Sequence, residues 1–243
     1  IISPGINIDK CQLSNFLKKN LKKLNTDLDI FFSMYGNNKN VTITGTNGKS
    51  TTAQIVHEVL RQEKIDVRVV GNIGNPILSE KNITNETVFV IEASSYQLDY
   101  SKIFRANIAV ILNITPDHLE RHRSLKNYIR AKFKLIKIQK KENFAILNTN
   151  NFYIKSQLNN RNYLPKIIKV NKKIESSILK KLNNPYFITD GNKENLSFVI
   201  EIAKLFEIKK KNLIKVINNF KGLNFRQQII FKSKSLTIIN DSK

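Results

Sequence analysis

The chain has 243 residues and a formal net charge of +22, with 41 lysines and arginines against 19 aspartates and glutamates. Its single cysteine, Cys11, cannot form an internal disulfide, which excludes a disulfide-stapled secreted scaffold, and no apolar run approaches the roughly 20 residues that span a bilayer. The basic excess lies after residue 100, where 30 basic residues accompany 9 acidic ones, without the aromatic stacking residues or recognition helix of a nucleic-acid module. We therefore expect a cytoplasmic protein with a lysine-rich solvated surface that binds neither membranes nor nucleic acids.

Short β-branched runs alternate with stretches whose apolar residues have helical spacing. In chain order, the sequence predicts strands at residues 41–44 and 67–70 around a helix at 50–63, then strands at 88–91 and 108–112, a helix at 125–139 and a strand at 144–147. Weaker strand patterns at 167–170 and 186–189 precede helices at 194–206, capped by Asn192, and at 211–220. This alternation predicts an α/β fold with a mostly parallel sheet covered by helices on both faces, and ligands that bind beyond the carboxyl ends of the strands.

The two ends of the chain differ from this pattern. Residues 1–33 contain a lysine-rich, helix-like stretch but no complete βαβ unit. Residues 236–239 form a strand-like run that is followed directly by the polar Asn240-Asp241-Ser242-Lys243. We expect one complete central domain with parts of neighbouring domains at both ends.

A glycine-containing turn follows the first predicted strand. Gly45 and Gly48 leave room for backbone N–H groups to approach phosphate oxygens, Lys49 adds a positive charge, and a hydroxyl of Ser50 or Thr51 can ligate Mg²⁺. The common phosphate-loop pattern requires a glycine at the position of Ile43, so the generic motif is not met. The position between a strand and a helix nevertheless favours phosphate binding over a simple connecting turn.

Polar residues also follow the other strands. Glu92 ends the third strand, where a carboxylate suits Mg²⁺, although an ordinary solvated glutamate is equally compatible. Asn72 follows the second strand on the same rim. After the fourth strand, His118 and His122 lie in one loop, which favours a functional role for that loop. Lys132, taken alone, is one lysine among many and predicts a solvated helix position.

In this order, the motifs closely resemble those of the Mur ligase superfamily, the ATP-dependent amide-forming enzymes of peptidoglycan assembly. Residues 45–51 are similar to the phosphate loop of that superfamily, which also lacks the early glycine. Within the superfamily, Glu92 with residues 94–98, the turn at 71–76 and the opening Ser3-Pro4-Gly5 most resemble the ligases that add D-glutamate to UDP-N-acetylmuramoyl-L-alanine. The match is specific over residues 41–135 and looser beyond them.

The resemblance implies a site for ATP and two Mg²⁺ ions. The residues that would contact ATP at its phosphates are Gly45, Thr46, Asn47, Gly48, Lys49, Ser50 and Thr51. Ser50, Thr51 and Glu92 would ligate one Mg²⁺, and His118 would ligate the second together with Lys132, which this family carbamylates to an oxygen-donating anion. Lys49, His118 and Lys132 are then the expected catalytic residues, which replaces the reading of Lys132 as a solvated lysine.

The resemblance also implies contacts to the rest of the nucleotide and to the substrate. Asn192 and Asn195 match a pair on the adenine side, with Gly191 in place of the family's histidine. Arg226 and Asp241 would approach the nucleotide from the segment that opens the third domain. The substrate-binding residues would be Asn72, Ser94, Gln97 and Lys243.

The implied domains are the tail of a UDP-binding N-terminal domain at 1–33, a central ATP-binding domain at 34–222, and the start of a C-terminal amino-acid-binding domain at 223–243. The implied reaction joins D-glutamate to UDP-N-acetylmuramoyl-L-alanine through an acyl phosphate, in a monomeric enzyme, and residues 1–243 alone are expected to be inactive. Two alternatives stay open. One is another ligase of the superfamily, such as folylpolyglutamate synthase, and the other is a nucleotide-binding module without ligase activity.

Overall fold

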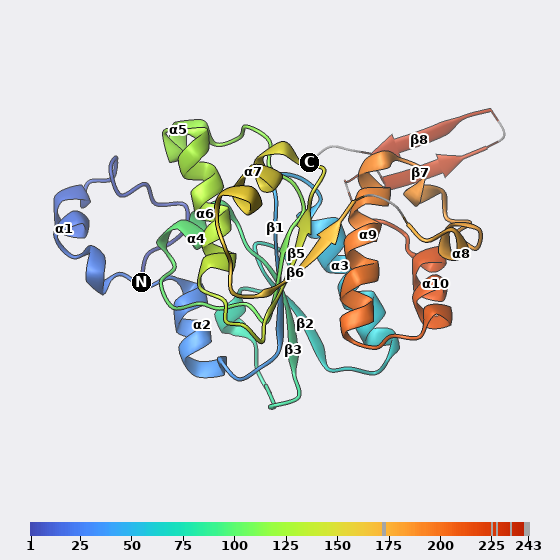
Figure 1. Ribbon diagram of the computed structural model, residues 1–243, viewed down its shortest axis with the longest axis horizontal. Coiled ribbons are helices and arrows are strands. Elements are labelled where there is room, and N and C mark those ends of the chain that lie inside the picture. The colour runs from blue at the N-terminus through green and yellow to red at the C-terminus, as the bar shows by residue number, and fades with distance from the viewer. Residues whose placement is uncertain (172–173, 225, 227, 234, 241–243) are drawn as a thin grey trace.

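The computed structural model describes residues 1–171, 174–224, 226, 228–233 and 235–240, and contains a six-stranded sheet flanked by helices, followed by a two-stranded hairpin (Figure 1). The strands are β1 (Asn40–Thr44), β2 (Val67–Gly71), β3 (Val88–Glu92), β4 (Ile108–Ile111), β5 (Phe144–Asn148), β6 (Lys166–Val170), β7 (Gln228–Lys232) and β8 (Thr237–Asn240). The helices are α1 (Ser14–Lys19), α2 (Asp27–Tyr35), α3 (Lys49–Gln62), α4 (Ser95–Tyr100), α5 (Leu119–His122), α6 (Leu125–Lys137), α7 (Phe152–Asn160), α8 (Ser176–Leu179), α9 (Asp190–Leu205) and α10 (Lys210–Asn219). Three 3₁₀ turns lie at Leu21–Lys23, Ile77–Ser79 and Pro185–Phe187.

The large sheet has the strand order β2-β3-β1-β4-β5-β6, and each neighbouring pair is parallel. The connection after β1 runs through α3 to β2 on one side, whereas the connection after β4 runs through α5 and α6 to β5 on the other. The two loops therefore diverge at the carboxyl ends of adjacent strands, which is where open α/β sheets bind their ligands.

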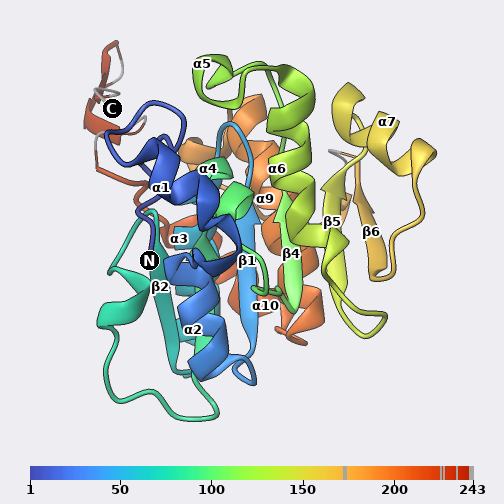
Figure 2. The same ribbon diagram turned by 90° about the vertical axis from the view of Figure 1, so that its left-hand side faces the viewer.

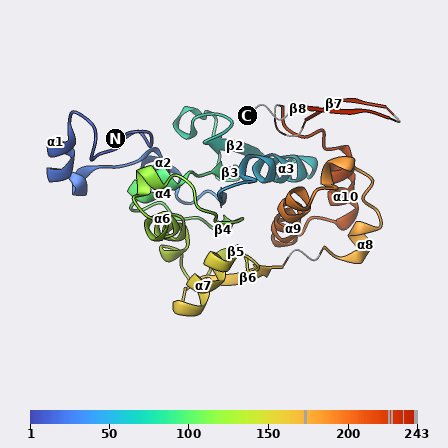
Figure 3. The same ribbon diagram turned by 90° about the horizontal axis from the view of Figure 1, so that it is seen from above.

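Helices cover both faces of the sheet, as predicted. One core contains Val41, Ile43 and Val90 of the sheet with apolar residues of α3, α9 and α10. The opposite core contains Phe89, Ile91 and other sheet residues with apolar residues of α2, α4, α6 and α7. Figure 3 shows the two helical layers on either side of the strands.

The central strand β1 is polar on the face that lies towards α6. Val41 and Ile43 belong to the core with α3, so the alternating Asn40, Thr42 and Thr44 lie on the other face, and all three are buried. Asn40 Nδ2 donates to Asn107 Oδ1 at 3.0 Å, and Thr42 Oγ1 donates to Asn40 Oδ1 at 3.0 Å. These buried polar groups therefore have hydrogen-bond partners, as burial requires.

The six strands of the large sheet, the four predicted helices and the strand-like run before Asn240 are confirmed, with shifts of a few residues at their ends. The predicted strand at 186–189 is wrong. Tyr186 and Phe187 form a 3₁₀ turn and pack edge-on and tilted against Phe220, so this apolar run packs against the residue that directly follows α10. The prediction of Asn192 as a helix cap is also wrong, since α9 begins at Asp190 and its cap is Thr189.

Helix α2 was not predicted, and it packs against the sheet through Leu28 and Phe31. The expected domain boundary at residues 33–34 falls inside this helix. Within the described residues, none of the helices has the length and apolarity that crossing a membrane requires.

Asp29 of α2 joins the N-terminal segment to the loop between α4 and β4. One carboxylate oxygen accepts hydrogen bonds from the Ser101 hydroxyl at 2.8 Å and from the backbone N–H groups of Lys102, Ile103 and Phe104 at 2.9, 2.9 and 3.2 Å. The other oxygen accepts from the backbone N–H and the hydroxyl of Thr26. Burial alone would raise the pKa of Asp29, but these hydrogen bonds outweigh it and lower the pKa.

Asp29→Ala is expected to lower the free energy of unfolding by about 3 kcal/mol, because several buried donors lose their acceptor at once. Since the folded pKa lies below the unfolded one, the stabilisation by Asp29 is present above the unfolded pKa near 4 and is lost as the pH falls through the folded value. Urea unfolding at pH 7 and at pH 3 measures both effects. The exposed Glu142→Ala is the matched control, and an equal change in both variants would contradict the assignment.

Candidate functional site

The loop between β1 and α3 forms a compact turn around the Lys49 side chain. Lys49 Nζ donates to the carbonyl oxygens of Gly45 at 3.1 Å and Thr46 at 2.8 Å. Burial lowers the pKa of Lys49, opposed by the charge of Glu92 and assisted by that of Arg226. Because α3 begins at Lys49, its first N–H groups have no partner within the helix, so a cation and a helix N-terminus meet at one point.

Asn113, which follows β4, fixes the shape of this loop. Its side-chain oxygen accepts hydrogen bonds from the backbone N–H groups of Thr46 at 3.1 Å and Asn47 at 2.9 Å, and its amide donates to the Asn47 carbonyl. The Thr46 hydroxyl in turn lies 3.0 Å from the Tyr128 hydroxyl and accepts from the Thr115 backbone N–H. The loop after β1 is thus held by the loop after β4 and by α6.

Two buried oxygens beside the loop have no hydrogen-bond partner in the described part of the chain: Ser50 Oγ and Glu92 Oε2. The other oxygen of Glu92 accepts from Asn72 Nδ2 at 2.8 Å, which orients the carboxylate. A buried hydroxyl and a buried carboxylate oxygen are ligands of the kind that Mg²⁺ prefers. The described residues contain no group of three His, Cys, Asp or Glu side chains able to hold a metal, so a cation here would need further oxygens from a bound phosphate or water.

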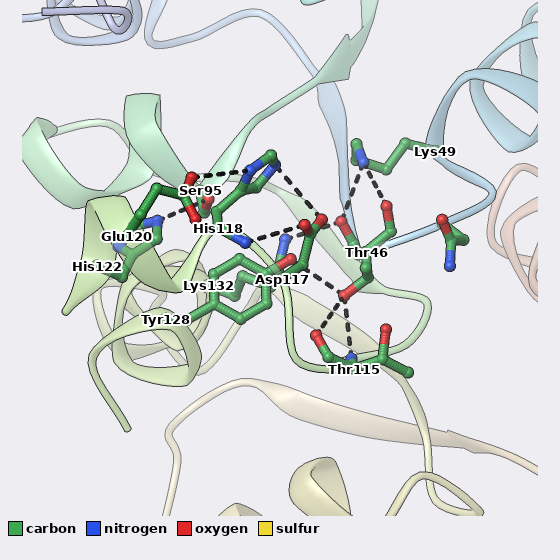
Figure 4. A network of polar contacts seen from close by, with 12 residues as sticks. Thr46, Lys49, Ser95, Thr115, Asp117, His118, Glu120, His122, Tyr128 and Lys132 are labelled. Carbon is green, nitrogen blue, oxygen red and sulfur yellow. Dashed lines mark hydrogen bonds and ion pairs between the residues drawn. The ribbon is translucent and has the colours of Figure 1, made fainter. Parts of the chain in front are cut away.

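Lys132 of α6 is 1% exposed and lies against the same loop (Figure 4). Its ammonium donates to the Gly45 carbonyl at 2.8 Å and to Thr44 Oγ1 at 3.4 Å, and lies 4.6 Å from the centre of the Tyr128 ring. Burial, together with repulsion from Lys49, lowers the pKa of Lys132 to about 7. The structure therefore places a buried lysine, with a strongly lowered pKa, beside the loop between β1 and α3.

His118 and His122, which sequence spacing did not distinguish, have different surroundings. His118 adopts a left-handed conformation with φ of 52°, and its half-exposed ring lies near Asp117 and 5.0 Å from the Tyr96 ring. His122 is buried, stacks on Tyr96, and its Nε2 lies 2.9 Å from Ser95 Oγ. Burial lowers the pKa of His122, which favours its neutral form within the packed interior, whereas His118 is accessible to a ligand.

A cavity of about 390 Å³ opens next to the loop between β1 and α3. It is lined by Asn47 and Gly48 of the loop, by polar residues that follow β4 and β5, and by Gly191, Glu194 and Asn195 of α9. Asn192 is not among its described lining residues, since its side chain donates to the Tyr186 carbonyl at 2.8 Å. The volume and polar lining suit part of a small polar molecule such as a nucleotide.

The sequence profile described as "Mur ligase middle domain" matches residues 43–224. The chain belongs to the Mur ligase family. Its curated relatives include the UDP-N-acetylmuramoylalanine--D-glutamate ligases of Rickettsia bellii, 33% identical over 267 residues, and of Clostridioides difficile, 33% identical over 260 residues. Both alignments cover 100% of this chain but only 58% and 57% of those proteins, so the chain spans little more than half of their length.

Solved Mur ligases share the fold at low identity. A MurF ligase from Thermotoga maritima in complex with ADP has a TM-score of 0.64 and 15% identity, covering 91% of this chain and 57% of that one. The UDP-N-acetylmuramate:L-alanyl-gamma-D-glutamyl-meso-diaminopimelate ligase from Neisseria meningitides has a TM-score of 0.66 and 15% identity, covering 90% and 78%. The expected α/β fold and the resemblance to this family are therefore confirmed.

The described residues that the resemblance assigned to substrate binding do not form one cluster in the structure. Asn72 contacts Glu92 at the rim of the site. Ser94 and Gln97 form the capping box of α4, and Gln97 Nε2 also donates to Asp27 at 2.9 Å, so their polar atoms are engaged within the protein. Arg226 is near enough to Lys49 to affect its pKa. Asp241 and Lys243 lie outside the described residues, and the substrate roles stay predictions.

Several described residues of the site had no functional role in the sequence analysis, among them Thr44, Asn113 and Tyr128. Asn113 follows a predicted strand, so its position at the carboxyl end of the sheet was a usable signal. Tyr128 fits the apolar stripe of its helix and gave no sign that its hydroxyl would reach Thr46, 82 positions earlier.

Gly48→Ala is expected to weaken ADP binding by about tenfold or more. Gly48 has φ of +82°, and a Cβ there would lie 2.2 Å from Asn195 Oδ1, so the substitution strains the backbone and displaces a cavity residue. Calorimetric titration with ADP measures the loss. Gly5→Ala, where an added Cβ meets nothing within 4 Å, is the control, and unchanged affinity in Gly48→Ala would contradict this account.

Proposed function

We propose that this chain is the nucleotide-binding part of an ATP- and Mg²⁺-dependent ligase that adds D-glutamate to UDP-N-acetylmuramoyl-L-alanine in peptidoglycan precursor synthesis. The names of the relatives at 33% identity over the whole chain support the acceptor and the amino acid. The observation that carries the proposal is the meeting, at and beside one loop, of Lys49, Lys132 and two oxygens, of Ser50 and Glu92, that have no partner among the described residues.

The residues at this loop suit activation of a carboxylate by ATP. A carboxylate is a poor acyl donor, so transfer of the γ-phosphoryl group to it gives an acyl phosphate, which the amine of D-glutamate then attacks with release of phosphate. The transferring phosphoryl group is strongly anionic, and Lys49 with the N-terminus of α3 provides fixed positive charge where that group would lie. No nucleophilic side chain is needed for this route.

Two cation positions are included in the proposal. Ser50, Thr51 and Glu92 would hold one Mg²⁺, and the unpartnered buried oxygens of Ser50 and Glu92 fit that role. His118 and a carbamylated Lys132 would hold the second. Bound Mg²⁺ would supply charge neutralisation at the phosphates.

Carbamylation of Lys132 has a physical basis in its depressed pKa. Only the neutral amine attacks CO₂, forming an N–C bond and releasing one proton to solvent. With a pKa of about 7, Lys132 is about half neutral at pH 7, whereas an ordinary lysine is neutral in roughly one molecule in three thousand. The product is an anion, which removes the repulsion between Lys132 and Lys49.

The experiment is phosphate release by a ligase of the relatives' length that contains this segment. We expect release that requires both UDP-N-acetylmuramoyl-L-alanine and D-glutamate, with no turnover of folate-type acceptors plus L-glutamate. The opposite preference would favour a folylpolyglutamate synthase-like ligase. For residues 1–243 alone we expect ADP binding without D-glutamate-dependent release, and release by this segment would contradict the proposed division of the enzyme.

A further inference from the structure

A second cavity, of about 660 Å³, lies on the side of α6 that faces away from the phosphate loop. We call it the α6–α7 cavity. The lining residues that carry the inference are five cations and two aromatic residues: Lys126, Arg130, Lys134, Lys137, Arg161, Phe133 and Tyr163. Figure 2 shows α7 beside α6 near the far edge of the sheet, and Arg161 and Tyr163 follow α7 directly.

The cavity concentrates positive charge that no ion pair among the described residues offsets. The four α6 cations are spaced by four, four and three residues, so they form one stripe about 16 Å long on the helix surface. Among the described residues, none of the five cations forms an ion pair, and the one carboxylate in the lining is that of Asp99. Lys134 instead donates to the Asp99 backbone carbonyl at 2.7 Å. Like charges at this spacing repel, and an anion in the cavity would remove the repulsion.

The inner wall of the cavity is aromatic and carries an unused polar group. Phe133 is 4% exposed, and its ring centre lies 5.8 Å from that of Tyr163. The Tyr163 hydroxyl is buried and has no hydrogen-bond partner within the described residues. A buried hydroxyl without a partner is unfavourable unless a ligand supplies one.

The cavity is separate from the nucleotide cavity beside the phosphate loop. The two share no lining residue in the described part of the chain. Lys132 points to Gly45 on the inner side of α6, whereas Arg130 is exposed on the outer side. A ligand bound to the outer side would therefore not occupy the ATP site.

We propose that the α6–α7 cavity binds a phosphorylated small molecule that carries a flat ring, of which a nucleoside diphosphate is the simplest example. The phosphates contact the cation stripe and Arg161, and the ring packs against Phe133 and Tyr163 with an acceptor at the Tyr163 hydroxyl. The volume lies within the range of about 300–1,000 Å³ that small-molecule sites occupy.

Equilibrium dialysis of the 243-residue chain with radiolabelled ADP tests the proposal. We expect two ADP molecules per chain, one at the phosphate loop and one at the α6–α7 cavity. Arg130→Glu combined with Arg161→Glu is expected to weaken ADP binding at the α6–α7 cavity at least tenfold, which leaves one ADP per chain. Tyr163→Phe is expected to weaken binding there about fivefold. The charge-matched control combines Lys140→Glu with Lys141→Glu, which are exposed and outside the lining, and it should retain two.

ADP binding at the phosphate loop of the Arg130→Glu/Arg161→Glu variant shows that this variant is folded. One ADP per chain in both the unmodified protein and the Arg130→Glu/Arg161→Glu variant at millimolar ADP, or two in that variant, would overturn the proposal. One ADP in the unmodified protein and none in the variant would instead count against the proposed ligase function, so the two failures are distinguishable.

Discussion

Lys49→Ala is expected to reduce ATP hydrolysis by the proposed ligase by about a hundredfold to a thousandfold. Lys49 already sits among loop carbonyls at 2.8 and 3.1 Å, at the start of α3, so it is held in place before nucleotide binds. Its loss removes the fixed charge that would stabilise the transferring phosphoryl group. Phosphate release at saturating ATP measures the effect.

Two variants accompany this measurement. Lys49→Arg keeps the charge but changes its shape, and we expect it to recover only a small part of the rate, because the loop carbonyls enclose a single ammonium. Arg61→Ala removes an exposed cation from the last turn of the same helix and should leave the rate unchanged. Equal rates for Lys49→Ala and Arg61→Ala would exclude a phosphate-binding role for Lys49.

Lys132→Ala is expected to abolish turnover, with no recovery on addition of bicarbonate and partial recovery with a short-chain carboxylic acid that supplies the missing anion. In the unmodified protein, removal of CO₂ should lower activity and bicarbonate should restore it. Because the pKa of Lys132 is about 7, its neutral fraction rises as the pH rises through 7, so carbamylation at constant dissolved CO₂ should increase from pH 6 to pH 8.

The carbamate can be observed directly by ¹³C NMR after equilibration with ¹³CO₂. We expect one slowly exchanging carbamate signal that disappears in Lys132→Ala and persists in Lys140→Ala, which alters an exposed lysine beyond the end of the same helix. Activity that is indifferent to CO₂, or a signal that survives in Lys132→Ala, would rule out the modification.

Local patterns were sufficient to predict the parallel sheet and to single out the loop between β1 and α3 as a candidate phosphate site. The strands are short β-branched runs, and the glycines, Lys49 and Ser50 are adjacent in sequence, so neither inference depended on distant contacts. Helix α2 was missed although its capping box, Thr26 with Asp29, is a local signal. The run at 186–189 misled because an apolar run of that length fits a strand and a packed turn equally well.

The environment of Lys132 depended on tertiary structure. The neighbours of Lys132 in α6 do not distinguish it from exposed lysines such as Lys137. Its burial depends on contacts with a distant segment, including the Gly45 carbonyl 87 positions earlier. Only the resemblance to a family pointed to it. Glu92 was noticed from its place at the end of a predicted strand, but its burial, and an oxygen without a partner among the described residues, become evident only once β3 lies beside β1.

The polar face of β1 has a consequence for the precision of the site. A slip of β1 by one residue against β3 and β4 would exchange its faces, placing Asn40, Thr42 and Thr44 among the aliphatic side chains of α3 and α9 and separating them from their hydrogen-bond partners. Most strands of an all-apolar parallel sheet carry no such penalty. The polar side chains on β1 therefore fix its register in the sheet. The register sets which residue ends the strand, and so the position of the following loop relative to Lys132.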